Sequence, residues 1–190
     1  MAERTIVGLS GNLARPSRTR LLVREILDSV EARGLGRTVL HDLVDAGPEL
    51  GAAIRRDDLP AAPERVIAAI EQADALVVAT PVYKAAYTGL FKHLFDLIDP
   101  RMLEGRPVIL AATGGSHRHA LVIEHHLRPL FAFFRAHAAP IGLYAADADF
   151  TPEGALTEEM RARIAPAVDQ IDGLLRVRAS APAVPTLRVA

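Results

Sequence analysis

The chain has 190 residues, of which 50% are hydrophobic, which is enough for one sizeable core and short for two. Its 22 basic and 23 acidic residues give a net charge of -1, which excludes the strong positive field typical of a nucleic-acid binder. There is no cysteine, so disulfides, thiolate-bound metals and iron–sulfur clusters are excluded, and electron transfer would need a bound organic cofactor.

We expect one domain over residues 1–176 and an Ala- and Pro-rich tail over residues 177–190. Residues 1–5 run directly into an apolar strand and lack the features of a secretion signal. No stretch is long enough to span a bilayer, so we expect a cytoplasmic protein with no membrane partner.

Short β-branched runs alternate with longer helical patterns along the whole chain. The predicted strands are residues 5–10, 38–43, 75–80, 108–112 and 141–145. The predicted helices are residues 19–32, 63–72, 88–98, 119–136 and 157–175, with Pro129 and Pro166 expected to kink or restart the last two. Residues 44–60 are interpreted as a long surface excursion.

Residues 75–79 of the third strand and 108–112 of the fourth are continuously apolar, as strands buried on both faces should be. Five such strands with helical connections predict an α/β fold, a flavodoxin-like five-stranded parallel sheet of order 2-1-3-4-5 with helices on both faces. In that order strands 1, 3 and 4 are neighbours, and ligands bind beyond their carboxyl ends. The loops after these strands therefore hold the candidate site residues.

The loop after the first strand combines hydroxyl and guanidinium groups at the start of a helix. Ser10, Ser17 and Thr19 supply hydroxyls, and Arg15 and Arg18 supply positive charge. With the free N–H groups of a helix start, these residues predict a phosphate site. An N-capped helix with solvent-facing arginines explains the same residues equally well.

Two further loops favour a flat ligand. Pro81, Val82, Tyr83 and Lys84 form a Pro-led turn after the third strand, and Thr113, Gly114, Gly115 and Ser116 follow the fourth. Paired glycines allow main chain to approach a planar ring closely. Either loop alone is compatible with an ordinary turn, but together with the first loop they predict a phosphate pocket beside a slot for a heterocycle.

At these residues the sequence resembles the NAD(P)H-dependent FMN reductase family, and within it the reductase components of two-component alkanesulfonate and methanesulfonate monooxygenases. The resemblance departs from the family pattern at Asn12, Leu13 and Ala14. The runs that carry it are residues 10–11, 15–19, 79–84, 89–98, 112–116, 119–121 and 127–130.

The resemblance implies a homotetramer with FMN and either NADPH or NADH as cofactors, and a flavin-dependent monooxygenase as the partner that receives reduced FMN. It places Ser10, Arg15 and residues 17–19 on the FMN phosphate, and residues 81–84 and 113–116 around the isoalloxazine ring. Hydride passes directly between nicotinamide and flavin, so we expect no dedicated catalytic acid or base.

Two other functions remain open for this fold: an FMN-bound quinone or azo reductase, and a flavodoxin-like electron carrier. The carrier class usually has an acidic surface, which this chain lacks.

Four histidines, His117, His119, His125 and His126, invite a metal hypothesis. No carboxylate-rich cluster accompanies them, so we expect surface or interface histidines and no metal. In relatives this helix packs at the tetramer interface and can carry a π-type bulge, which suggests a role of His125 and His126 in assembly or flavin release.

Overall fold

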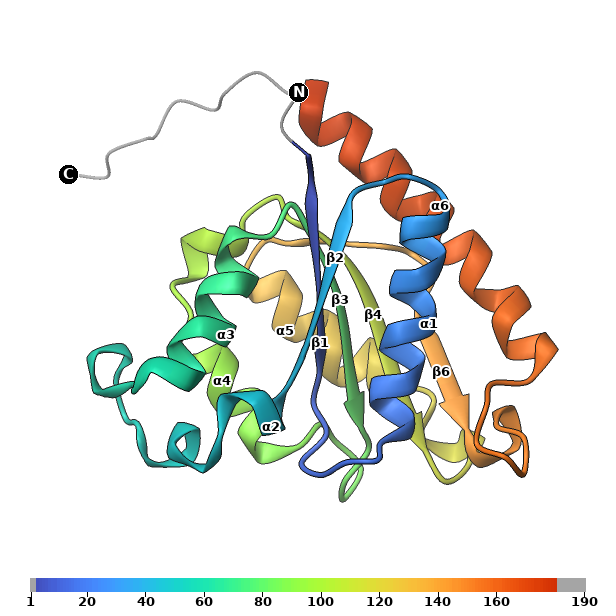
Figure 1. Cartoon of the computed structure of the whole chain (residues 1–190), viewed down its shortest axis with the longest axis horizontal. Coiled ribbons are helices and arrows are strands. Elements are labelled where there is room, and N and C mark those ends of the chain that lie inside the picture. Colours follow the sequence, from blue (N-terminus) through green and yellow to red (C-terminus); the bar gives the residue numbers. More distant parts are fainter. Residues whose placement is uncertain (1–2, 181–190) are drawn as a thin grey trace.

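A computed structural model of the chain describes residues 3–180. Its core is a parallel sheet in which the strands run β2-β1-β3-β4-β5, with β6 also pairing with β4 (Figure 1). The strands are β1 Thr5–Ser10, β2 Arg37–Asp42, β3 Ala75–Pro81, β4 Pro107–Gly114, β5 His137–Ala138 and β6 Leu143–Ala146. The predicted order is confirmed, with β5 and β6 sharing the place of the fifth strand.

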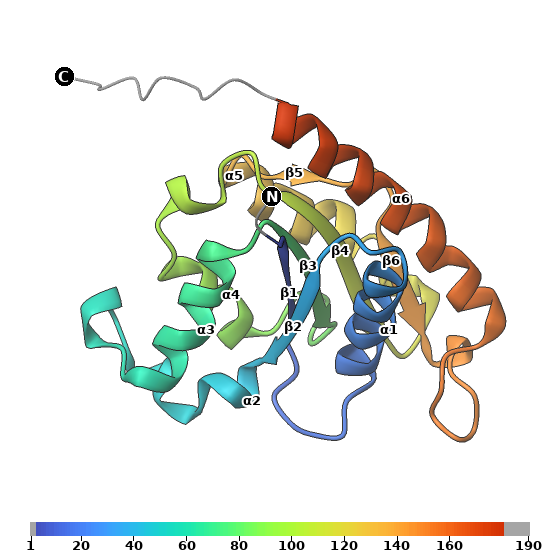
Figure 2. The same cartoon turned by 45° about the horizontal axis from the view of Figure 1, so that its top comes forward.

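Helices cover both faces of the sheet, as the sequence predicts (Figure 2). One face carries α1 and α6, and the other carries α2, α3, α4 and α5. The helices are α1 Arg18–Ala32, α2 Leu43–Ala46, α3 Ala61–Gln72, α4 Gly89–Asp96, α5 Arg128–Phe133 and α6 Glu158–Ser180.

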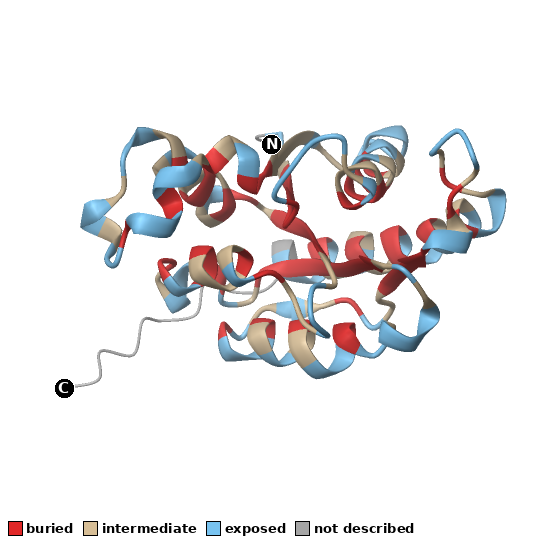
Figure 3. Cartoon of the chain, turned by 90° about the horizontal axis from the view of Figure 1, so that it is seen from below, coloured by how far each residue is buried: buried red, intermediate tan, exposed pale blue. Residues whose placement is uncertain are grey.

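The sheet has a hydrophobic core on each of its faces, because successive side chains of a strand point to opposite faces. In β3, Leu76 and Val78 face the helices α3 to α5, whereas Val77 faces α1 and α6. All three are fully buried, as are Ala75 and Ala79, so β3 is apolar up to the buried Thr80. Viewed toward the carboxyl edge of the sheet, the buried residues form a middle layer between two helical layers (Figure 3).

Helix α1 packs closely on the first strand because Gly8 has no side chain. A Cβ at Gly8 would lie 2.6 Å from Val23 Cγ1 and 2.7 Å from Leu27 Cδ1, both in α1. This contact brings the start of α1 toward the carboxyl end of β1, where the candidate phosphate loop lies.

The fifth strand differs from the predicted span 141–145, because the chain pairs with β4 in two separate pieces. β5 pairs with the start of β4, and β6 pairs with its end. Between them lies Pro140, which has no N–H to donate to a ladder. Arg128 donates to the carbonyls of Ala139 and Pro140 at 3.1 and 3.2 Å, and so satisfies acceptors that the break exposes.

The predicted helix 119–136 is likewise divided. It consists of a 3₁₀ turn at His117–His119, a π-helix at Ile123–Leu127 and then α5. Pro129 lies in the first turn of α5, where a missing N–H costs nothing, so its predicted restart is confirmed. Pro166 does not restart α6, which runs unbroken.

The excursion after β2 is more structured than predicted. It holds α2 and two 3₁₀ turns, Pro48–Ala52 and Arg56–Asp58, and buries Leu50 completely. At the other end, α6 passes the expected domain boundary at residue 176 and continues to Ser180. Residues 181–190 of the expected tail lie outside the described part of the chain. Within the described part, no helix is long and apolar enough to cross a membrane.

Candidate active site

The loops after β1, β3 and β4 are tied together by backbone hydrogen bonds at the carboxyl edge of the sheet. Gly11 N–H donates to the Ala79 carbonyl at 2.7 Å, and Val82 N–H donates to the Thr113 carbonyl at 2.8 Å. The Thr88 hydroxyl also donates to the Gly11 carbonyl at 3.2 Å. The predicted convergence of these loops is therefore confirmed.

The start of α1 presents the donors expected of an anion site. Ser17 caps the helix, and its hydroxyl accepts a hydrogen bond from Arg20 N–H at 3.2 Å. The other N–H groups of the first helical turn have no acceptor within the helix, so they can serve a ligand. The buried Thr19 hydroxyl lies 2.6 Å from the Thr113 hydroxyl, which joins this loop directly to the loop after β4.

Arg18 is held at the rim of this site by two contacts. Its Nη1 lies 2.6 Å from Asp147 Oδ1, and its guanidinium carbon lies 5.0 Å from the centre of the Phe150 ring. Both partners belong to the segment after β6. The side chains of Arg18 and Asp147 are 52% and 62% exposed, so water screens this ion pair.

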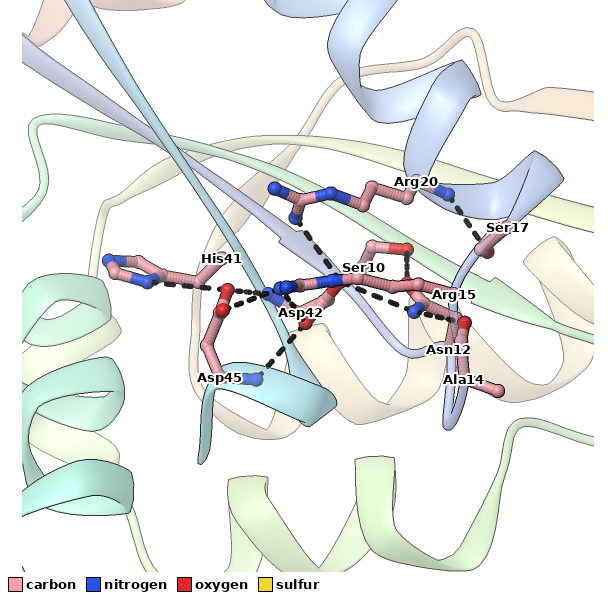
Figure 4. Close-up of polar contacts among 9 residues, drawn as sticks. All are labelled: Ser10, Asn12, Ala14, Arg15, Ser17, Arg20, His41, Asp42 and Asp45. Atoms are coloured by element: carbon pink, nitrogen blue, oxygen red, sulfur yellow. Dashed lines mark hydrogen bonds and ion pairs between the residues drawn. The ribbon is translucent and has the colours of Figure 1, made fainter. Parts of the chain in front are cut away.

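Arg15 points toward the end of β2, where it binds the carboxylates of Asp42 and Asp45 (Figure 4). Its Nε and Nη2 donate to the two oxygens of Asp42 at 2.8 and 2.7 Å, and Nη2 also reaches Asp45 at 2.5 Å. These two acceptors raise the pKa of Arg15 above its ordinary value. In the structure its guanidinium therefore anchors the loop to β2.

Asp42 is the centre of this network, and its side chain is fully buried. It also accepts from Asn12 at 3.3 Å, from Arg20 at 3.2 Å and from the backbone N–H of Asp45 at 3.1 Å. Burial works against the charged carboxylate, but the hydrogen bonds from Arg15, Asn12 and Asp45 outweigh it. The pKa of Asp42 is consequently lower than usual.

Ser10 contributes to the same network. The Ser10 hydroxyl is buried and donates to Asn12 Oδ1 at 2.6 Å, while Asn12 Nδ2 donates to the Ala14 carbonyl at 2.9 Å. Asn12 thus joins the end of β1 to Ala14 in the middle of the loop. Of the residues predicted for the phosphate, Ser17, Arg18 and Thr19 gather at the helix start, whereas Ser10 and Arg15 join the Asp42 network.

The loop after β3 contains a tight and strained turn. Tyr83 and Ala86 exchange backbone hydrogen bonds at 2.9 and 3.2 Å, and Lys84 and Ala85 between them have φ of 51° and 70°. Both lie in the left-handed region, which costs a non-glycine residue about 1 kcal/mol or more. The turn leaves the Tyr83 side chain 53% exposed at the edge of the site.

Tyr144 of β6 supports the loop after β4. Its hydroxyl donates to the Ser116 carbonyl at 2.7 Å, and a Cβ at Gly114 would collide with that hydroxyl. Burial, helped by the charges of Asp147 and Asp149, raises the pKa of Tyr144, so the phenol keeps its proton for this bond. Gly115 is open, because only Asp147 Oδ2, at 4.0 Å, comes near a Cβ built there.

This geometry fits a flat ring with a phosphate tail. The open Gly115 allows a ring to approach main chain, and the helix start joined to it through Thr19 and Thr113 provides hydroxyl and N–H donors for a dianion. Among residues 3–180 no group of three or more histidine, cysteine, aspartate or glutamate residues is placed to hold a metal ion.

The sequence reasoning missed Asp42, Asp45, Tyr144 and Asp147. Asp42 was within reach, because the order β2-β1 sets it beside Ser10 in the parallel register and an aspartate three residues later forms a capping box. Asp147 and Tyr144 carried no such signal, since their contacts come from the placement of the segment after the broken fifth strand.

Comparisons with known proteins point to one family. The family model for NADPH-dependent FMN reductase matches residues 4–151. The NADH-dependent FMN reductase SfnF of Pseudomonas fluorescens is 52% identical over 84% of this chain and 85% of its own length. An FMN reductase (NADPH) of Pseudomonas aeruginosa is 47% identical over 84% of this chain and 86% of its own.

Solved structures agree as well. An NADH:FMN oxidoreductase, EmoB, superposes with a TM-score of 0.79 at 28% identity and covers 97% of this chain and 94% of its own. A flavodoxin-type WrbA-like protein of Agrobacterium tumefaciens, at 14% identity and a TM-score of 0.61 over 93% of this chain and 99% of its own, shares the fold. The chain therefore belongs to the NADPH-dependent FMN reductase family and is an oxidoreductase of flavodoxin-like fold that uses FMN and a reduced nicotinamide nucleotide.

Proposed function

We propose that the protein binds FMN across the three loops, reduces it with NADH or NADPH, and releases reduced FMN to a separate flavin-dependent monooxygenase that acts on sulfonates. The observation that carries the proposal is the direct link between Thr19 and Thr113 at 2.6 Å, which places the anion site and the ring site side by side. FMN has the matching shape, a planar ring with a phosphate at the end of a short chain.

Each part of the site has a role in this proposal. Ser17, Arg18, Thr19 and the first N–H groups of α1 hold the phosphate. Direct contact of Ser10 with the phosphate stays a prediction, because its buried hydroxyl donates to Asn12 in the structure. Direct contact of Arg15 with the phosphate stays a prediction, since Arg15 is fastened to Asp42 in the structure. The ring lies against residues 81–84 and 113–116.

FMN supplies the hydride acceptor when it is bound. The chain's own contribution is to hold the flavin and nicotinamide rings in stacked orientation and to keep that geometry fixed. Backbone N–H groups near Gly114 and Gly115 stabilise the negative charge that gathers at the pyrimidine edge of the flavin. No side chain needs to act as a general acid or base.

The test is steady-state oxidation of NADH and of NADPH with free FMN or riboflavin as acceptor. Arg18→Gln should raise the KM for FMN about tenfold, the size expected from losing one charge-assisted hydrogen bond, and leave the KM for riboflavin unchanged. Arg24→Gln, exposed on the same helix, is the matched control. Equal KM values for FMN in wild type and Arg18→Gln would remove the phosphate assignment.

This assay, together with gel filtration, separates the reductase from a flavodoxin-like carrier and from a quinone reductase. A reductase saturates with added FMN, and a flavodoxin-like carrier does not turn over. A quinone reductase would keep FMN through gel filtration and reduce menadione faster than FMN.

We also propose that the protein is a cytoplasmic homotetramer. An apolar cavity of about 510 Å³ opens beside the π-helix, lined among others by Tyr87, His126 and Phe133. Phe133 is 70% exposed and Leu121 is 62% exposed, and such apolar area favours self-association. His126 also packs edge-on against Tyr87 with ring centres 5.9 Å apart, so this face is linked to the loop after β3. A monomer mass in light scattering would contradict the assembly.

A further inference from the structure

The segment after β6 brings a carboxylate to the rim of the phosphate site. Asp147 lies in a 3₁₀ turn, Asp147–Asp149, whose backbone is fixed by the bond from Ala146 N–H to Asp149 Oδ2 at 2.7 Å. Its carboxylate pairs with Arg18 at 2.6 Å and stands next to Gly115 of the ring loop. An acid is the last group expected beside a dianionic ligand, because like charges repel.

This pair is built so that it can separate. Arg18 meets Asp147 through one nitrogen, and both side chains are more than half exposed. Exposed ion pairs of this kind contribute only about 0.2 to 1 kcal/mol. Stacking on Phe150 holds the guanidinium at the rim, so Arg18 can exchange one anion for another without a large movement.

We propose that Asp147 is a specificity-determining residue that competes with the flavin phosphate for Arg18 and so keeps FMN exchangeable. The inference rests on the proposed function, because it takes the phosphate to lie at the start of α1. FMN must take Arg18 from Asp147 and then sit beside the displaced carboxylate. Riboflavin has no phosphate and meets neither cost. Asp147 thus weakens FMN binding selectively and favours release of the reduced flavin.

The test measures flavin affinity by quenching of flavin fluorescence and the dissociation rate by stopped flow, on the full chain. Asp147→Asn should lower the Kd for FMN by up to about fivefold, the range set by an exposed ion pair, and slow FMN dissociation. The Kd for riboflavin should not change. Asp147→Glu keeps the charge and should stay close to wild type.

Two more variants make the result specific. Glu159→Gln removes an exposed acid at the start of α6 and controls for net charge. In an Arg18→Gln background, Asp147→Asn should have a smaller effect on the Kd for FMN, because there is then no arginine for which Asp147 and the phosphate can compete.

Two outcomes would overturn the competition: an unchanged or raised Kd for FMN in Asp147→Asn, or an equal gain in affinity for riboflavin. If Arg18→Gln alone leaves the Kd for FMN unchanged, the phosphate placement in the proposed function fails instead. The two failures are therefore distinguishable.

Discussion

Arg15, in the loop after β1, and Arg18, at the start of α1, lie three positions apart, yet their surroundings differ in kind. Arg15 binds the fully buried Asp42 through two nitrogens and Asp45 besides, whereas Arg18 meets the exposed Asp147 through one. The sequence around them does not separate the two, since both lie in the short polar run of residues 15–20.

The contrast shows that the burial of the acid partner decides what an arginine can do. A buried carboxylate that loses its partner stays in a medium of low dielectric, so Arg15 is costly to remove from Asp42. An exposed carboxylate is hydrated when its partner leaves, so Arg18 can separate from Asp147 at little cost in free energy. Arg15 therefore fixes the shape of the loop, and Arg18 is available to a ligand.

The largest expected effect comes from Asp42→Asn. It removes the charge that Arg15, Arg20 and Asn12 all bind, and should lower the free energy of unfolding by about 3 kcal/mol at neutral pH. Because the pKa of Asp42 is depressed by its hydrogen bonds, this stabilisation is present above the ordinary value of 3.8 and is lost as pH falls through the lower value in the folded state. Urea unfolding of both proteins from pH 7 toward pH 3 should show the difference shrinking. A constant difference at every pH would contradict the pKa assignment.

The two arginines can be compared directly. Arg15→Gln should cost about 2 kcal/mol, less than Asp42→Asn because Arg20 and Asn12 stay on the carboxylate and Arg15 is itself 42% exposed. Arg18→Gln should cost less than about 0.5 kcal/mol. Chemical denaturation at pH 7 measures both free energies of unfolding. Equal losses in the two variants would contradict the distinction between Arg15 and Arg18.

A smaller effect than that of Arg15→Gln concerns the hydrogen bond that joins the two loops. Thr19→Val leaves the buried Thr113 hydroxyl without its partner and should cost about 1 kcal/mol, as should Thr113→Val. The double variant should cost less than the sum, since no polar group is then left unpaired. Additive losses would show that the two hydroxyls do not stabilise each other.

The sheet could be predicted from the sequence because parallel strands that are buried on both faces are continuous runs of apolar residues. The runs at residues 75–79 and 108–112 are continuously apolar, and the structure places them in neighbouring central strands. The three candidate loops followed from the strand order alone, because that order forces their strands to be adjacent.

The π-helix, the break in the fifth strand and the ion pairs could not be predicted from the sequence, for physical reasons. The π-helix at Ile123–Leu127 has the same apolar spacing as an α-helix over so short a span, and the broken fifth strand depends on Pro140 and on Arg128 reaching its carbonyls. The ion pairs of Arg15 and Arg18 join residues 27 and 129 positions apart. Local sequence does not encode either pair, and only Asp42 could have been found, through the predicted order of β1 and β2.

The turn at Lys84 and Ala85 carries a consequence for engineering. Glycine would relieve the left-handed backbone at both positions, so a library selected for heat resistance alone should enrich glycine there. Glycine would also loosen the segment that holds Tyr83 at the proposed ring site. A gain in thermal stability and a loss of rigidity at the proposed ring site would therefore come from the same two residues.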